Sequence, residues 1–309
     1  MTASSQPEKR VLFCIADHLI EVFIPESFER KRLLPAFQPF RCDFPDNREV
    51  ICSIRVAENP IDIAQDSLVM LQEDTGIMGY WYCLMETEHN YVVDIQFVEN
   101  GNCYRMVTDK FFSNATVYLD GGDENATIIL SSFLMISFAQ SAVLHKTFLM
   151  HASVVEKDGK GFAFLGKSGM GKSTHSSLWI RYVEGVELLN DDNPAVRIDE
   201  NGSVKVYGTP WSGKTPCYKN RNVKLEALIR LEKATVNQFT WKKGKDALIT
   251  LLPSCTSMRW NDKLYTELCN LLEEIIGNVK IGYLKCMPDK DAALLCYAEI
   301  KKSCKFAAK

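Results

Sequence analysis

Short runs of alternating apolar and polar residues fill the first third of the chain, and they predict β-strands. The candidate strands are residues 21–24, 50–56, 79–86, 91–98, 104–108 and 115–119. The pair Asn100 and Gly101 lies between two of these runs and favours the positive φ angles of a tight hairpin turn. No catalytic motif occurs here, so we expect an antiparallel β-rich domain whose aromatic residues form a sheet core.

An uninterrupted apolar segment follows at residues 126–145, which contain no Asp, Glu, Lys or Arg. Its length matches the roughly 20 residues that a membrane span needs. The segment nevertheless includes four serines and a glutamine, and the acidic residues Asp123 and Glu124 precede it instead of basic ones. We therefore expect a buried helix and no membrane association.

Beyond residue 145 the pattern changes to apolar runs that alternate with helical periodicity. Strands are predicted at residues 148–156, 162–165, 186–189, 195–198, 203–207, 225–231 and 279–285, and helices at 174–182, 245–252, 262–276 and 289–300. This half is expected to be a mixed sheet flanked by helices. The predicted domains are residues 1–122, with about the first ten residues as a disordered tail, and residues 123–309.

The composition is that of a globular protein and argues against some classes of binding partner. Hydrophobic residues make up 46% and charged residues 24% of the 309 residues, as in soluble globular proteins. A formal net charge of -3 and a pI near 6.0 argue against nucleic-acid binding, which usually needs a strongly basic domain. Eleven cysteines form no C-x-x-C pair, and no secretory leader pattern precedes them. We therefore expect reduced thiols in a cytoplasmic protein.

The clearest motif is the stretch GFAFLGKSGMGKST at residues 161–174. Gly166, Gly171, Lys172 and Ser173 fit the G-x-x-x-x-G-K-[ST] pattern, and a strand-like run precedes them. Glycines are needed because backbone N–H groups converge on a phosphate only where side chains do not block them. The lysine adds a positive charge for the β- and γ-phosphates, and the serine offers a hydroxyl to Mg²⁺.

Two adjacent aspartates, Asp191 and Asp192, follow the next strand-like run after this loop. Phosphoryl transfer to a hydroxyl needs one carboxylate to hold metal and another to accept the proton of the attacking oxygen. The pair can supply both functions. A solvated loop charge or a helix cap is the alternative, and the apolar residues 186–189 before the pair argue against it.

His151 in HASVV, the loop GKSGMGKST and the segment LLNDDNP together resemble the catalytic domain of HPr kinase/phosphorylase and, more distantly, the phosphoenolpyruvate carboxykinases. The resemblance covers roughly residues 149–300 and does not extend to the β-rich half. Within that superfamily, the chain looks most like HPr-kinase-like proteins in which the kinase core follows an unrelated N-terminal domain. The resemblance therefore implies an HPr-kinase-like P-loop domain with a mixed sheet flanked by helices.

The resemblance also implies a role for each matching residue. The nucleotide phosphates would be bound by the loop residues Gly166, Lys167, Ser168, Gly169, Met170, Gly171, Lys172, Ser173 and Thr174. Ser173 and Asp192 would hold Mg²⁺, and Asp191 would act as the base toward an incoming hydroxyl. His151 would lie on the strand beside the loop, close to the γ-phosphate or the aspartate, and Lys172 and His151 would both be catalytic. The implied ligands are ATP, or another nucleoside triphosphate, and Mg²⁺.

One family feature is absent from the sequence. HPr kinase/phosphorylase has an acidic, arginine-bearing E-V-R-G type segment after the aspartates, and VYGTPWSGK stands in its place here. Lys214 or Arg221 would replace the missing positive charge near the transferred group. Trp211 would stack on a base or substrate, with a buried loop anchor as the equal alternative. His175 is expected to be structural.

These observations predict an ATP- and Mg²⁺-dependent kinase that phosphorylates a protein serine or a small metabolite. A nucleotide-sensing regulatory module with little or no turnover is the alternative, and the missing segment favours it. A carboxykinase-like enzyme is a third reading, for which the additional metal ligands and the substrate arginine have no counterpart. The expected partners are a nucleotide and a hydroxyl acceptor, with homo-oligomerisation as a further possibility.

Overall fold

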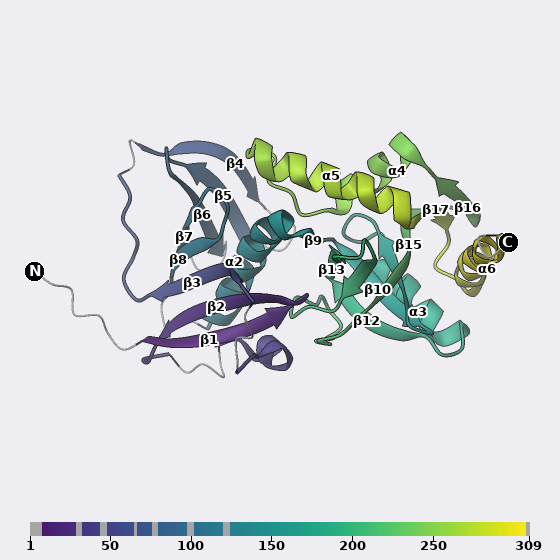
Figure 1. The fold of residues 1–309 in the computed structure, drawn as a ribbon, viewed down its shortest axis with the longest axis horizontal. Coiled ribbons are helices and arrows are strands. Elements are labelled where there is room, and N and C mark those ends of the chain that lie inside the picture. Colours follow the sequence, from purple (N-terminus) through teal and green to yellow (C-terminus); the bar gives the residue numbers. More distant parts are fainter. Residues whose placement is uncertain are drawn as a thin grey trace, which may run out of the picture. The chain divides into compact units, whose positions relative to one another are not determined.

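The chain folds into two compact units in a computed structural model that describes residues 8–28, 33–43, 48–64, 67–75, 80–97, 102–119 and 124–306 (Figure 1). Unit 1 comprises Met1–Leu144 and Met258–Leu264, and unit 2 comprises His145–Ser257 and Tyr265–Lys309. The two sheets and several helices agree with the mixed α and β class expected from the sequence.

Unit 1 is built on an eight-stranded sheet with the order β1-β2-β3-β8-β7-β6-β5-β4. Its strands are β1 (Glu8–Ile15), β2 (His18–Pro25), β3 (Val50–Ala57), β4 (Val69–Thr75), β5 (Tyr80–Glu86), β6 (Asn90–Phe97), β7 (Cys103–Asp109) and β8 (Asn114–Tyr118). The expectation of a purely antiparallel sheet is wrong, because β3 pairs in parallel with both β2 and β8. A short 3-10 helix, η1 (Pro35–Phe40), buries Phe37 against Phe13 of β1.

The apolar segment forms helix α2 (Ala126–Ser141) and the 3-10 turn η3 (Ala142–His145), and α2 packs against β3 and β8. Within the described part of the chain, Ala126–His145 is long and apolar enough to cross a membrane, and 61% of its most apolar window is buried inside the structure. The predicted burial is confirmed by Ile129, Leu130 and Phe133, which have no solvent exposure. Because of this packing α2 belongs to unit 1, whereas the division expected at residue 122 placed it in the second domain.

Some expectations for the first half fall on residues that the structure does not describe. The hairpin turn at residues 99–101, the Gly121-Gly122 boundary and residues 1–7 of the expected tail lie outside the described ranges. Residues 8–10 were also expected in that tail. They instead begin β1, because they pair with residues 23–25 of β2.

Unit 2 contains a nine-stranded mixed sheet. Its main path runs β12-β10-β11-β15-β14-β13-β9, with β17 beside β15 and β16 beside β17. The strands are β9 (Thr147–Leu149), β10 (Ala152–Lys157), β11 (Lys160–Leu165), β12 (Glu187–Asp192), β13 (Ala195–Ile198), β14 (Val204–Tyr207), β15 (Asn222–Lys233), β16 (Gln238–Lys242) and β17 (Lys280–Cys286). β11, β15 and β17 are parallel. Their carboxyl ends therefore meet at one edge, where open α/β sheets usually bind ligands.

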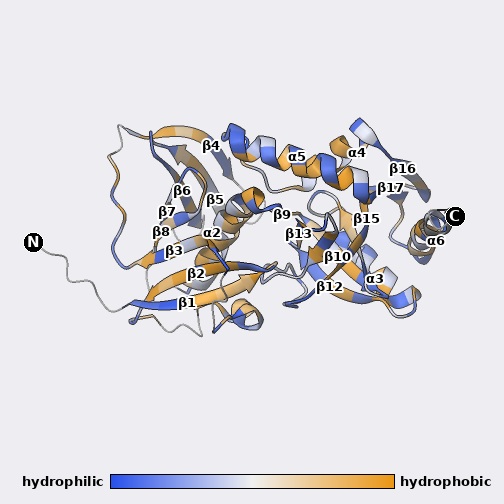
Figure 2. Ribbon diagram, viewed as in Figure 1, coloured by the Kyte–Doolittle hydropathy of each residue, from blue (hydrophilic) through white to orange (hydrophobic). Residues whose placement is uncertain are grey.

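The helices of unit 2 are α3 (Lys172–Tyr182), α4 (Gly244–Leu251), η4 (Leu252–Ser254) and α6 (Lys290–Phe306), together with most of α5 (Asp262–Asn278). Along α5 hydrophobic and hydrophilic residues alternate by helical turn (Figure 2). Leu264, Leu268 and Leu272 are buried there with at most 1% exposure. This periodicity is the signal that predicted the helix from the sequence.

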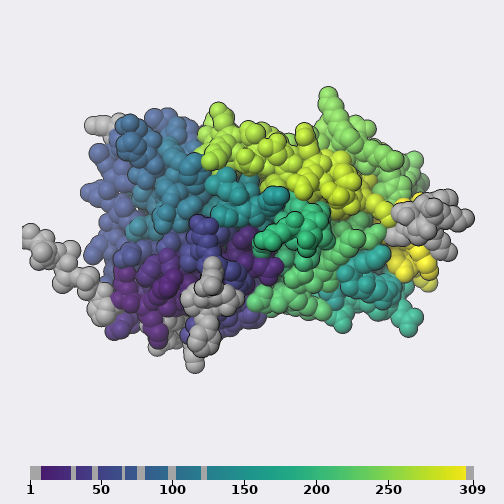
Figure 3. Space-filling view, in the orientation of Figure 1, coloured from purple at the N-terminus to yellow at the C-terminus, as the bar shows by residue number. Residues whose placement is uncertain are grey.

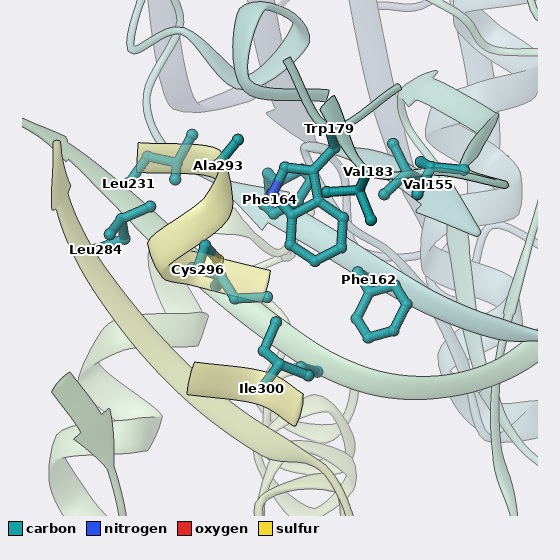
Figure 4. Packing of buried hydrophobic residues seen from close by; sticks show 13 residues of the cluster. Val155, Phe162, Phe164, Trp179, Val183, Leu231, Leu284, Ala293, Cys296 and Ile300 are labelled. Atoms are coloured by element: carbon teal, nitrogen blue, oxygen red, sulfur yellow. The ribbon is translucent and has the colours of Figure 1, made fainter. Parts of the chain in front are cut away.

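The core of unit 2 joins α3 and α6 to one face of the sheet (Figure 4). Trp179 of α3 is fully buried, and its ring lies 5.2 Å from both Phe162 and Phe164 of β11 and 5.6 Å from Tyr297 of α6. The opposite side of α3 is at the molecular surface (Figure 3), where Ile180 is 42% exposed. This packing fixes α3, and with it the loop that precedes the helix.

Candidate phosphate-binding site

The loop between β11 and α3 has the backbone shape of a phosphate-binding turn. β11 is buried from Gly161 to Leu165 and ends at Gly166. Gly166, Gly169 and Gly171 have φ angles of 154°, 75° and 99°, which side-chain-bearing residues rarely adopt. Helix α3 begins directly at Lys172. The first amides of a helix have no partner within it, so they point outward toward the loop.

The remaining loop residues lie where a ligand can reach them. Met170 is half-buried against the core of unit 2 and anchors the loop. Solvent-exposed residues are Lys167, Ser168, Gly169, Ser173 and Thr174. The hydroxyl proposed for Mg²⁺ is thus accessible, and it lies one residue after the buried lysine.

Lys172 points back into the loop. Its ammonium group donates to the Gly166 carbonyl at 3.0 Å and lies 2.8 Å from Nε2 of His151. The residue is only 8% exposed. Burial lowers the pKa of Lys172 from its ordinary value, and the negative charges of Asp192 and Asp191 oppose that shift. The structure therefore brings together the lysine, the histidine and both aspartates that the sequence singled out.

His151 connects the lysine to the acidic pair. It follows β9, and its backbone N–H donates to the Ser254 carbonyl at 2.7 Å. The same ring nitrogen, Nε2, lies 3.1 Å from Oδ1 of Asp192. A protonated Nε2 donates to that carboxylate, whereas an unprotonated Nε2 accepts from the lysine. The position of one proton thus decides which neighbour the imidazole binds.

The two aspartates are the last residues of β12, whereas the sequence predicted that the strand ends at Leu189. Asp191 is 3% exposed and pairs with Ser153 of β10 in the strand register. The Ser153 hydroxyl meets that of Ser176 in α3 at 2.6 Å, so this face of β12 looks toward α3 and the loop. The hydrogen bonds that reach Asp191 from Ser212 and Gly213 end on its backbone carbonyl, not on its carboxylate.

A carboxylate on a residue that is only 3% exposed is costly to keep charged unless a hydrogen-bond donor or a cation binds it. A second carboxylate, that of Asp192, lies next to it in the chain and also acts on Lys172. Both features fit an oxygen-binding cation such as Mg²⁺. Within the described ranges no three His, Cys, Asp or Glu side chains cluster to hold a metal alone. A Mg²⁺ ion that has few protein ligands takes the others from water and from substrate phosphates.

The segment after Gly208 packs over the acidic pair. Trp211 is 5% exposed, so it is a buried anchor of this segment and not a stacking platform. The amide of Gly213 and the hydroxyl of Ser212 both donate to the Asp191 carbonyl, the latter at 3.2 Å. Lys214 comes next and is exposed. Lys214 thus follows directly, along the chain, the two residues that bind the Asp191 carbonyl.

Arg221 does not join them. Its guanidinium lies 2.7 Å from Glu156 and 3.0 Å from Glu187, at the opposite end of β12 from Asp192. A β-strand rises about 3.3 Å per residue, so the five steps from Glu187 to Asp192 span roughly 16 Å. The structure therefore separates Arg221 from the loop.

His175 is a structural residue, as the sequence analysis expected. It is 3% exposed, stacks edge-on against Phe164 and accepts a hydrogen bond from Nε1 of Trp179 at 3.2 Å. Burial lowers its pKa from 6.5 to about 4, so the ring is neutral near pH 7. Its partners all belong to the core.

Sequence reasoning missed two groups that shape the site. The Ser153–Ser176 hydroxyl pair fastens α3 to β10, and the buried Thr209 binds residues on both sides of the aspartates. Isolated serines and threonines carry no periodic signal. The only sequence-level sign is a polar residue in an otherwise apolar run, as Ser153 is in HASVV.

Comparisons with known proteins find a likeness in structure and none in sequence. No protein-family model matches the sequence, and no curated protein matches it. Solved structures similar to this chain include the Hpr(Ser) kinase/phosphatase from Coxiella burnetii, at 14% sequence identity and a TM-score of 0.31. The match covers 52% of this chain and 92% of that one. At this level the likeness is a distant one of fold.

Proposed function

We propose that unit 2 is an ATP- and Mg²⁺-dependent kinase that transfers a phosphoryl group to a hydroxyl of a protein serine or a small metabolite. The observation that carries the proposal is the position of Asp191, which is 3% exposed and lies on the same side of the sheet as the glycine loop and Lys172. A loop of this kind alone indicates phosphate binding. A second carboxylate beside the one expected to hold the metal supports chemistry on the phosphate.

The roles follow from the positions of the groups. Loop amides and the Lys172 ammonium would bind the β- and γ-phosphates, for which Lys172 would exchange its bond to the Gly166 carbonyl. Ser173 and Asp192 would hold Mg²⁺, which when bound neutralises charge on the β- and γ-phosphates. The Asp191 carboxylate would take the proton of the acceptor hydroxyl while the hydroxyl oxygen bonds to the γ-phosphorus. The bond between the γ-phosphorus and the oxygen that bridges it to the β-phosphate would break, and ADP would leave.

Two further side chains support this assignment. His151 contacts both the lysine and Asp192, so it would hold these two groups at a fixed separation. Exposed Lys214 follows Gly213, whose amide binds the Asp191 carbonyl, so it would add positive charge on the acceptor side. A positive group near the transferred phosphoryl accelerates such reactions by orders of magnitude.

A second candidate is a nucleotide sensor with little or no turnover. The position of Arg221 favours it, because this cation is engaged by Glu156 and Glu187 at the far end of β12. Of the two residues that the sequence offered for a positive charge near the transferred group, Lys214 alone then remains. Calorimetric titration with ADP, ATP and Mg²⁺ beside a turnover assay separates the two candidates, since tight binding without turnover indicates a sensor.

Transfer of labelled phosphate from ATP to proteins and to hydroxyl-bearing metabolites tests the kinase proposal. We expect Asp191→Asn to lower the transfer rate by about 10²- to 10⁴-fold while nucleotide binding persists, because it removes the proton acceptor and keeps the shape. Asp158→Asn is the matched control, since this carboxylate is 77% exposed in the turn before β11. Equal transfer by wild type and Asp191→Asn would refute the role of Asp191 as the base.

A further inference from the structure

Asp192 has a backbone conformation that no other described non-glycine residue adopts. Five other described non-glycine residues have positive φ angles, and all of these lie between 50° and 64°, in the small left-handed region open to L-amino acids. The φ angle of Asp192 is 143°, well outside that region. Such a conformation persists only when surrounding contacts enforce it.

The unusual angle has a consequence for the acidic pair. In a regular strand, neighbouring side chains point to opposite faces. Asp191 faces α3, as its register with Ser153 shows, so a regular β12 would turn the Asp192 carboxylate away from the loop. Asp192 instead lies 3.1 Å from His151, and both carboxylates act on the charge of Lys172. The distorted backbone thus directs two adjacent carboxylates toward the same cation.

The hydroxyl of Thr209 holds the backbone on both sides of this distortion. Thr209 is fully buried, and its Oγ1 donates to the Asn193 carbonyl at 2.7 Å, immediately after the pair. The same oxygen accepts from Nδ2 of Asn190 at 3.2 Å, immediately before the pair, and from the Trp211 amide at 3.3 Å. A single hydroxyl therefore connects the residue before the aspartates, the residue after them and the covering segment.

The covering segment adds weaker support. The Asn193 amide donates to the Trp211 carbonyl at 3.4 Å, and the Ser212 hydroxyl donates to the Asp191 carbonyl at 3.2 Å. These bonds depend on the path that Thr209 and Trp211 set for the chain. Ser212 is half-buried, so it can be changed with less disturbance than Thr209.

We propose that Thr209 is the positioning residue that holds Asp192 in its strained conformation and thereby sets the geometry of the metal–nucleotide site. This inference rests on the proposed function of that site. Thr209 acts through Asp192 and does not touch the nucleotide. Its removal should therefore impair the contribution of Mg²⁺ to nucleotide binding while leaving the loop's own contribution intact.

The test compares Thr209→Val with Thr209→Ser in the full chain. Valine keeps the shape and removes the hydroxyl, whereas serine keeps the hydroxyl. ATP binding is measured by calorimetry with and without Mg²⁺, and the readout is the factor by which Mg²⁺ tightens binding. We expect Thr209→Val to reduce this factor about tenfold and Thr209→Ser to keep it within about threefold of wild type, with Mg²⁺-free binding unchanged in both.

A double-mutant cycle with Asp192→Asn separates positioning from general damage. If Thr209 acts through Asp192, adding Thr209→Val to Asp192→Asn leaves the Mg²⁺ factor unchanged. Equal weakening of binding with and without Mg²⁺, or equal effects of the valine and serine variants, would overturn the proposal.

If Thr209→Val fails to fold by circular dichroism, Ser212→Ala takes its place. We expect Ser212→Ala to reduce the Mg²⁺ factor about two- to threefold, and an unchanged factor counts against the proposal. A wild type without Mg²⁺-dependent binding would instead refute the proposed function, and the positioning role with it.

Discussion

At the scale of single residues, burial determines the behaviour of the charged and titratable groups in unit 2. Lys172 and His175 lie one helical turn apart at the start of α3, and burial lowers the pKa of both. Lys172 has two carboxylates nearby that oppose the shift, whereas desolvation is the sole cause for His175. The histidine is therefore a neutral part of the core near pH 7, whereas the lysine has two carboxylates nearby that favour its charged form.

This difference predicts a pH dependence of stability. Between pH 6.5 and about 4 the unfolded chain binds a proton on His175 that the folded chain does not. The free energy of unfolding should therefore fall as pH drops through this window, by about 3 kcal/mol in total from this residue. The loss is absent well above pH 6.5, where His175 is neutral in both the folded and the unfolded chain. Urea denaturation from pH 7.5 to 4 measures it, as the difference between wild type and His175→Leu.

The matched control is His89→Gln, because the His89 side chain is 80% exposed. We expect this variant to follow the wild-type pH dependence, because the substitution leaves the core around His175 intact. A His175→Leu protein with the wild-type slope between pH 6.5 and 4 would show that His175 does not carry the effect.

At the scale of elements, α3 is the helix that positions the loop, and Trp179 is its main anchor in the core. Trp179→Ala removes a fully buried ring that contacts Phe162, Phe164 and Tyr297. We expect a loss of about 3–5 kcal/mol in the free energy of unfolding, measured by urea denaturation. Ile180→Ala on the exposed side of the same helix should cost less than about 1 kcal/mol. Equal losses would contradict the assigned packing.

The sequence predicted elements well where their patterns are local. Apolar alternation located β3, β5, β6, β7 and β8, and helical periodicity located α3 to α6. It missed β1, β16 and β4, whose exposed Val69 and Met70 break the alternation. It also predicted one strand at residues 148–156, where the structure has β9 and β10 on either side of His151. Strand direction was also out of reach, because the parallel pairing of β3 depends on distant partners. For the site, the sequence identified the motif residues. It did not identify the hydrogen bonds of Thr209, because Thr209 is 16 residues after Asn193, whose carbonyl it binds.

At the scale of the whole molecule, unit 1 is not continuous in sequence. Met258–Leu264 belongs to it although the rest of the unit ends at Leu144. The hydroxyl of Tyr91 in β6 donates to the Trp260 carbonyl at 3.4 Å, and Nδ2 of Asn261 donates to the Lys110 carbonyl at 2.8 Å. No pattern of hydrophobic residues indicates that a segment so late in the chain belongs to unit 1. The sequence therefore predicted a single domain boundary.

Asn261 has two functions in this returning segment, so its substitution should affect two places far apart in sequence. Besides binding Lys110, its side-chain oxygen accepts from the Leu264 amide at 3.1 Å and so caps the start of α5. We expect Asn261→Ala to lower the free energy of unfolding of unit 1 by about 1–2 kcal/mol. Hydrogen exchange should then quicken both in the first turn of α5 and in the turn around Lys110. Asn278→Ala is the control, because its side chain binds only Glu274 within α5, and the Lys110 turn should keep its wild-type exchange. Faster exchange confined to α5 in Asn261→Ala would mean that the segment does not stabilise unit 1.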